Sequence, residues 1–280
     1  MAEKISLINM KGGVGKSTLA ANLAWHFSAI KKWKKNVLLV DLDPQFNASQ
    51  YTLGAGRYQK QVIETEKPTT WDIFEQATRA PGLKSKGTSL DDAIQRIASF
   101  RSGQHLDLVP SQLELFYTLR NPSQKEHLLA NFIDDHEDKY DLILIDCAPT
   151  ESVLTTASYL ATDHILVPVK PDYLSSIGLP LIKQSMDEFQ KLYKKQISMV
   201  GVCFNGCSGY SPEEITAKDE VREIAKRFNW NVFDEEIPYS RSFPKGAREG
   251  SPIFRTSYAR TKVADRTAKF CNAFARKINL

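Results

Sequence analysis

The stretch from Ile5 to Thr18, ISLINMKGGVGKST, constrains the fold of this chain more strongly than any other segment. Its first residues are apolar and predict a buried strand, and the apolar segment from Leu19 to Ile30 predicts a helix. Between the two lies a glycine-rich loop that ends in Gly-Lys-Ser. A strand, a glycine loop and the start of a helix form the context of a phosphate-binding loop. We therefore expect nucleotide phosphates to bind at Gly12, Gly13, Val14, Gly15, Lys16, Ser17 and Thr18.

Each residue type in this loop has its own expected role. Glycine adopts unusual backbone angles and lets backbone N–H groups approach phosphate oxygens closely. The following helix directs the positive end of its dipole at the same oxygens. We expect Lys16 to neutralise the β- and γ-phosphates and the Ser17 hydroxyl to bind Mg²⁺. A glycine-rich turn without a ligand, which is the alternative, would not carry Gly-Lys-Ser at the start of a helix.

Two further predicted strands end in carboxylates. The segment 36–41 predicts a strand that runs into Asp43, and the segment 141–146 predicts another. An acid just past a buried strand of a parallel sheet faces the crevice in which ligands bind. We expect Asp146 to hold Mg²⁺ through a water molecule, Asp41 to support the metal or the loop, and Asp43 to orient or activate an attacking water. The alternative for Asp41 and Asp43 is a simple strand-terminal acid and helix cap.

The rest of the chain alternates between predicted helices and strands. We expect helices over 70–77, 90–99, 112–120, 124–135, 152–161, 179–193, 213–228 and 258–278, and strands over 106–110, 164–169 and 198–204. The range 79–87 predicts an exposed loop and 243–252 an irregular segment. This alternation predicts an α/β fold with a doubly wound, mostly parallel sheet flanked by helices. We expect one domain over residues 1–280, with a possible insertion at about 51–105.

Asn205 directly follows the predicted strand 198–204. At the end of a parallel strand, its side-chain amide could read the edge of an adenine base. The alternative is an ordinary turn residue before Gly206.

The composition excludes several classes of protein. With 280 residues, of which 42% are hydrophobic and 25% charged, the chain suits one large α/β domain or two small ones. Charged Glu3, Lys4 and Lys11 interrupt the apolar residues near the start, so we expect no signal peptide, and no apolar stretch reaches the length of a membrane span. The cysteines lack the spacing of a disulfide framework or a metal site. We therefore expect them to be reduced and to behave as small apolar residues, as in a cytoplasmic protein; they are Cys147, Cys203, Cys207 and Cys271.

The formal net charge of +4 hides an asymmetry. The range 239–280 holds ten Lys and Arg residues against Glu249 and Asp265 alone, so this basic C-terminal region carries +8 and the remainder carries −4. Such an asymmetry indicates a polyanionic partner for one end of the chain. The alternative is a solvated surface helix.

Four segments together resemble the ParA/Soj branch of the deviant Walker A ATPases, in the ParA/MinD group of P-loop NTPases. The segments are KGGVGKST, VLLVDLDPQFNAS, YDLILIDCAPT and VPVKPDY, and an Ile-Pro-x-Ser sequence follows at 237–240. Lys11, directly before the first glycine, has no role in an ordinary phosphate-binding loop but fits the form xKGGxGK[ST] of this group. One departure concerns the position after the Ile-Pro pair, where Tyr239 stands and family members commonly have arginine.

The resemblance implies an ATPase that uses ATP and Mg²⁺ and closes two subunits face to face. Lys11 would then reach across to the nucleotide of the partner subunit, and Pro238 would join the nucleotide-binding residues. The ATP-bound homodimer would bind nonspecific DNA in a nucleoid-associated, cytoplasmic state, and a ParB-like activator protein would stimulate hydrolysis. The candidates for contact with DNA phosphates are Arg241, Lys245, Arg248, Arg255, Arg260, Lys262, Arg266 and Lys269.

Two alternatives remain on the same fold. A MinD-like membrane-surface ATPase would need a terminal amphipathic helix outside the fold, whereas the apolar face of the range 258–278 is modest enough to pack on a core, so we expect no membrane partner. An ATP-dependent metabolic synthase would not need Lys11, and an iron–sulfur carrier would need cysteines paired across a dimer.

Overall fold

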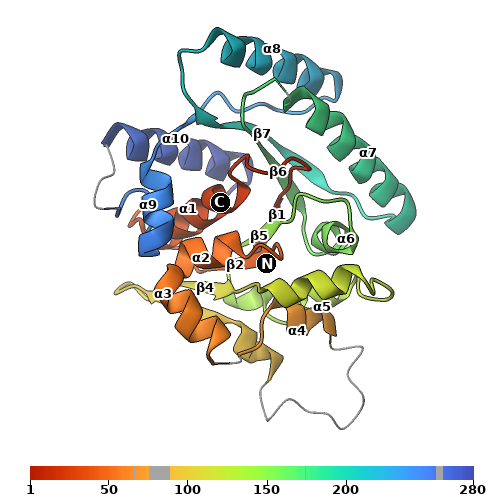
Figure 1. Cartoon of the computed structure of the whole chain (residues 1–280), viewed down its shortest axis with the longest axis vertical. Coiled ribbons are helices and arrows are strands. Elements are labelled where there is room, and N and C mark those ends of the chain that lie inside the picture. The colour runs from red at the N-terminus through yellow and green to blue at the C-terminus, as the bar shows by residue number, and fades with distance from the viewer. Residues whose placement is uncertain (66, 76–88, 174, 257–260) are drawn as a thin grey trace.

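The computed structural model describes residues 1–65, 67–75, 89–173, 175–256 and 261–280. Its centre is an eight-stranded sheet with the order β3-β4-β2-β5-β1-β6-β7-β8 (Figure 1). The strands are β1 (Glu3–Leu7), β2 (Val37–Leu42), β3 (Gln95–Ser99), β4 (His105–Val109), β5 (Leu142–Cys147), β6 (His164–Val169), β7 (Ser198–Cys207) and β8 (Ile237–Pro238). Neighbouring strands are parallel except β3 and β4, which are antiparallel. The predicted fold class is therefore confirmed.

Helices cover both faces of the sheet (Figure 1). They are α1 (Lys16–Ala29), α2 (Asn47–Leu53), α3 (Ala55–Tyr58), α4 (Thr70–Glu75), α5 (Leu128–Asp134), α6 (Val153–Leu160), α7 (Ser175–Tyr193), α8 (Pro212–Arg227), α9 (Ser242–Glu249) and α10 (Thr261–Lys277). Short 3-10 turns occur at Leu90–Ala93, Leu113–Leu119 and Glu137–Lys139, and a π turn at Gln59–Ile63. No helix of the described ranges combines the length and the apolar character needed to cross a membrane.

Each face of the sheet has its own core, because successive side chains of a strand point to opposite faces. Leu38 and Val40 of β2 pack with α4 to α8, whereas Val37 and Leu39 pack with α1, α2 and α10. All six residues of β2 and all six of β5 are buried, as expected for central strands of a parallel sheet. The two cores fix where the carboxyl ends of β1, β2 and β5 meet.

Two predicted elements are wrong. The range 90–99 is a 3-10 turn followed by the edge strand β3, because residues 95–99 pair with β4, and such pairing overrides local helix propensity. The range 243–252 is largely helix α9, which accommodates Pro244 in its first turn and ends at Gly250 with φ of +62°. The predicted loop 79–87, and the ends of the predicted helices at 76–77 and 258–260, lie outside the described residues.

A buried histidine in α1 makes the stability of the fold dependent on pH. His26 is 6% exposed, and its Nε2 accepts a hydrogen bond from Trp33 Nε1 at 3.1 Å. Burial, with a smaller effect from Lys32, lowers the pKa of His26 from 6.5 to about 4. Between these values the unfolded chain binds a proton that the folded protein does not bind, so stability falls as pH falls from 6.5 to 4. Above pH 6.5 this contribution is constant.

We expect His26→Gln, which keeps an acceptor for Trp33, to remove this dependence. Urea unfolding at pH 7 and at pH 4.5 measures it. The wild type is expected to lose about 2–3 kcal/mol more than the variant between the two pH values. Equal losses in the two proteins would show that His26 is protonated in the folded state.

Candidate functional site

The phosphate-binding loop joins β1 to α1 at the carboxyl edge of the sheet. Its last residue, Gly15, has φ of +82°, and a Cβ placed there would lie 2.3 Å from Asn205 Nδ2. Only glycine fits this position, because the backbone is left-handed and the space is filled. Helix α1 then begins at Lys16 without a side-chain cap or an acid in its first turn. The N–H groups of that turn are therefore available to an anion.

Lys16 lies beneath the loop. The residue is 6% exposed, and its Nζ donates a hydrogen bond of 3.2 Å to the backbone oxygen of Asn9, just after β1. Ser17 and Thr18 follow in the first turn of α1 and line the same cavity as Lys16. The predicted phosphate-binding residues other than Val14 therefore line one cavity.

Asp41 and Asp146 face each other across neighbouring strands, since Asp41 of β2 is in register with Asp146 of β5. Both are fully buried. Asp41 accepts hydrogen bonds from the backbone N–H and hydroxyl of Ser49, at 2.7 and 2.6 Å, and from the backbone N–H of Asp43 at 3.2 Å. Asp41 thereby anchors α2 to the end of β2. By contrast, neither carboxyl oxygen of Asp146 has a hydrogen-bond partner among the described residues.

The two carboxyls resist being charged together. Burial, opposed by the hydrogen bonds from Ser49, raises the pKa of Asp41 to about 7. Burial and then the negative charge of Asp41 raise the pKa of Asp146 well above its ordinary value, although the Ser17 hydroxyl and the charge of Lys16 act in the opposite direction. The carboxyl of Asp146 lies near the hydroxyl of Ser17 in the first turn of α1, and the two groups form an oxygen donor set. This donor set fits Mg²⁺, which prefers carboxylate and hydroxyl oxygens.

We expect Asp146→Asn to stabilise the ligand-free protein, because burying a carboxylate without a hydrogen-bond partner costs more than burying a neutral amide. The same change is expected to abolish the effect of Mg²⁺ on nucleotide affinity. Thermal unfolding without ligands, and nucleotide titrations with Mg²⁺ or EDTA, measure the two effects. A less stable variant that still responds to Mg²⁺ would contradict this assignment.

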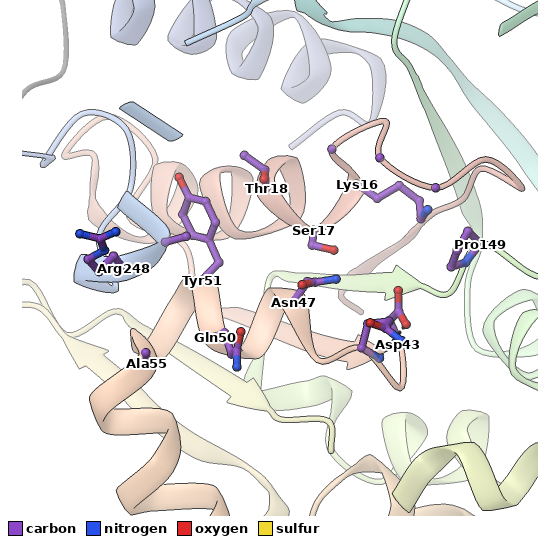
Figure 2. Close-up of a pocket in the computed structure, with 15 residues that line it drawn as sticks. Lys16, Ser17, Thr18, Asp43, Asn47, Gln50, Tyr51, Ala55, Pro149 and Arg248 are labelled. Atoms are coloured by element: carbon purple, nitrogen blue, oxygen red, sulfur yellow. Dashed lines mark hydrogen bonds between the residues drawn. The ribbon is translucent and has the colours of Figure 1, made fainter. Parts of the chain in front are cut away.

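A cavity of about 730 Å³ opens over the loop (Figure 2). One part of its wall comes from the loop, Asp43 and Pro149, and another comes from α2 and the end of α9. Asp43 is 6% exposed and fixed by a 2.9 Å hydrogen bond from the N–H of Gln45 to its Oδ1. The wall also includes Ala247 and Arg248 of α9. Arg248, predicted as a DNA contact, thus lies at the same cavity as the phosphate-binding loop.

Lys11 points elsewhere. It is not among the described residues that line the cavity, and its Nζ makes a 2.5 Å ion pair with Asp172, which follows β6. Its backbone N–H donates to Asn9 Oδ1 at 2.9 Å, and Asn9 Nδ2 donates to the backbone oxygen of Pro168 at 2.8 Å. The side chain of Asn9 therefore ties the loop entrance to the end of β6. Sequence patterns missed Asn9 and Asp172, although Asp172 lies in the VPVKPDY segment.

Asn205 lies inside β7 rather than beyond its end, so the predicted strand boundary was wrong. Its Nδ2 donates to the backbone oxygens of Val14 at 2.8 Å and Gly15 at 3.3 Å. In this arrangement the Asn205 amide supports the phosphate-binding loop. Pro238, in β8, pairs with Cys207 two residues further along β7.

Apart from Arg248 and Arg260, the predicted DNA-contact residues lie in three places along the chain. Arg241 and Lys245 belong to α9 and its N-cap, Arg255 lies in the following segment, and Lys262, Arg266 and Lys269 lie on α10. Arg260 lies outside the described residues. Several of these cations are already engaged: Lys245 pairs with Glu249 at 3.8 Å, Arg266 pairs with Glu236 at 3.5 Å, and Arg255 stacks over the Trp25 ring at 5.6 Å. Lys262 and Lys269 are exposed on α10.

The opposite face of α10 is buried. Val263, Phe270, Phe274 and Ile278 pack into the core that also holds α1. The terminal helix is therefore part of the fold, with its charged residues left at the surface. All four cysteines are free and buried, as predicted.

Comparison with known proteins places this site in context. A family model described as an AAA domain matches residues 2–199. The chain is 28% identical to the chromosome-partitioning ATPase Soj of Treponema pallidum, over 90% of this chain and 89% of that protein. An ATP complex of Cyanothece McdA superposes with a TM-score of 0.77 at 18% identity, covering 100% of this chain and 97% of that one. A plasmid partition protein of Borrelia burgdorferi bound to AMPPNP gives a TM-score of 0.73 at 21% identity, covering 100% and 99%. The two structural likenesses concern the fold.

Proposed function

The chain belongs to the AAA domain family and is homologous to Soj and ParA partition proteins, and from this premise we propose that it is a DNA-partitioning ATPase. In this proposal ATP brings two subunits together, the dimer binds nonspecific DNA, and a ParB-like partner stimulates hydrolysis and resets the cycle. The cargo is a plasmid, a chromosome or another body that must be segregated or positioned.

The two lysines of the loop, Lys11 and Lys16, lie at different places relative to the cavity, and this difference is the main support for the proposal. Lys16 lies buried under the loop and lines the cavity, whereas Lys11 sits outside it in an ion pair with Asp172. A cation outside the cavity of its own subunit can serve the nucleotide of a second subunit if that nucleotide replaces Asp172 as its partner. This geometry supports a role for Lys11 across a dimer interface, as for an arginine finger supplied in trans.

Within one subunit, the loop and α1 bind and orient the phosphates. The loop N–H groups and Lys16 hold the phosphate oxygens, and they stabilise the charge that spreads over the γ-phosphate during transfer. Ser17 and Asp146 would hold Mg²⁺, which would neutralise phosphate charge when bound. Asp43 lines the cavity and one of its oxygens accepts a hydrogen bond from Gln45, which supports a role for its carboxylate in orienting the attacking water.

The exposed side of α10 supports the DNA-binding part of the proposal. Lys262 and Lys269 project from a helix whose other face is anchored in the core, so the cations are presented on a rigid support. Contacts of Lys and Arg with phosphates need no sequence reading and weaken as salt rises. The buried apolar face of α10 also disfavours the membrane-surface alternative, because that face is not free to enter a lipid interface.

Light scattering with size separation tests the nucleotide-driven assembly. With ATP and Mg²⁺, the mass is expected to double from the 31.6 kDa of one chain, and with ADP it is expected to stay at that value or return to it. A protein that binds and hydrolyses ATP but keeps the mass of one chain throughout would refute the dimer cycle.

A further inference from the structure

We propose that Arg248 is a nucleotide-binding residue, which contacts the nucleoside part of the bound nucleotide and does not belong to the DNA surface. The inference rests on the proposed ATPase function of the same cavity. Arg248 is then no longer a candidate for contact with DNA, unlike the other cationic residues of the basic C-terminal region, and its role is to bind the nucleotide.

Arg248 lies at the end of the cavity that is far from Lys16 (Figure 2). Lys16 and Pro149 stand at one end of the cavity, and Arg248 stands at the opposite end beside Tyr51 (Figure 2). The P-loop lysine and the first turn of α1 take the phosphates, so a nucleotide bound there extends its sugar and base away from Lys16. Arg248 is the cationic side chain that the described chain contributes to that other end.

The backbone around Arg248 is held firmly against α2. Gly250, which ends α9 with φ of +62°, lies so close to α2 that a Cβ there would be 2.5 Å from the backbone oxygen of Leu53. The end of α9 is therefore in direct contact with the helix that contributes Gln50 and Tyr51 to the cavity wall. Arg248 is placed by this contact, so its location at the cavity follows from the packing of two helices.

The side chain of Arg248 is also free to bind. Among the described residues it has no hydrogen bond or ion pair, whereas Lys245 on the same helix pairs with Glu249. The side-chain amides of Asn47 and Gln50 in the same wall likewise make no hydrogen bond within the described chain. A guanidinium stacks on flat aromatic rings and donates several hydrogen bonds from one plane. An adenine ring offers a flat aromatic face for stacking, and the base and the ribose offer hydrogen-bond acceptors.

Nucleotide titrations of Arg248→Ala test this assignment, with Arg101→Ala as the matched control. Arg101 is an exposed arginine in the turn between β3 and β4, away from the cavity. Affinities for ATP and ADP are read by displacement of a fluorescent nucleotide, and tripolyphosphate is used as a competitor that lacks the nucleoside. We expect Arg248→Ala to weaken ATP and ADP by about tenfold each, with tripolyphosphate unchanged and Arg101→Ala like the wild type.

Two results would overturn the inference. Unchanged ATP and ADP affinities with weaker DNA binding would return Arg248 to the DNA surface. Equal weakening of ATP and tripolyphosphate would assign it to the phosphates instead. The proposed function is tested independently of Arg248. If the wild type binds ATP but not DNA, the partition function is refuted, whereas the comparison of ATP with tripolyphosphate in Arg248→Ala still tests the role of Arg248.

Discussion

Replacing Lys11 with alanine is expected to lower stimulated ATP hydrolysis by about 1,000-fold, the scale of effect of a cation supplied in trans to a transferring phosphoryl group. The affinity of one subunit for ATP is expected to stay close to that of the wild type, because Lys11 is not among the residues that line its own cavity. ATP turnover at saturating nucleotide and the equilibrium affinity for ATP measure the two effects independently.

Lys35→Ala is the matched control for this experiment. Its side chain is 27% exposed against 28% for Lys11, and it too forms an ion pair, with Asp141 at 3.9 Å. It should turn over ATP like the wild type. Asp172→Asn, which releases Lys11 from its ion pair, should retain stimulated hydrolysis. Full activity in Lys11→Ala would exclude a role in trans for this lysine.

Lys16→Ala is expected to lose tight nucleotide binding itself. Its ammonium lies under the loop, and each charge-assisted hydrogen bond to a phosphate is worth about 1.5–3 kcal/mol, so the loss of two weakens ATP by about 100-fold or more. The variant should still fold, because within the described chain Lys16 makes one hydrogen bond, to the backbone of Asn9. Fluorescent nucleotide binding measures the affinity, and circular dichroism checks the fold.

The contrast between the two lysine variants is the informative result. One should bind ATP without fast hydrolysis, and the other should fail at binding. Identical behaviour of Lys11→Ala and Lys16→Ala would remove the distinction between a lysine that serves its own subunit and one that serves the partner.

The sequence predicts best those parts of the site that are local along the chain. The loop from Gly12 to Thr18 is continuous, and its strand, glycine and helix context is visible in one window. Asp146 follows a short run of apolar residues, which is typical of a buried strand. For these segments, local preference and tertiary structure agree, so the predicted elements are found where they were expected.

Features that depend on distant segments could not be predicted in the same way. The pairing of Lys11 with Asp172 joins residues 161 positions apart, and the approach of α9 to α2 brings Arg248 to a wall built mainly from the first 55 residues. β3 is a strand because β4 lies beside it, although its own sequence suits a helix. The sequence does not distinguish among the basic residues of the C-terminal region. Their positions in the fold do, because Arg248 lies at the cavity whereas Lys262 lies on α10.

The proposed partition function is tested by binding to a nonspecific DNA duplex with ATP, with ADP and without nucleotide, over a series of salt concentrations. We expect tight binding only with ATP, and a steep loss of affinity as salt rises because Lys and Arg release counterions from the phosphates. If the protein does not bind DNA in any nucleotide state, it is an ATPase without DNA binding, and the proposed partition function is contradicted.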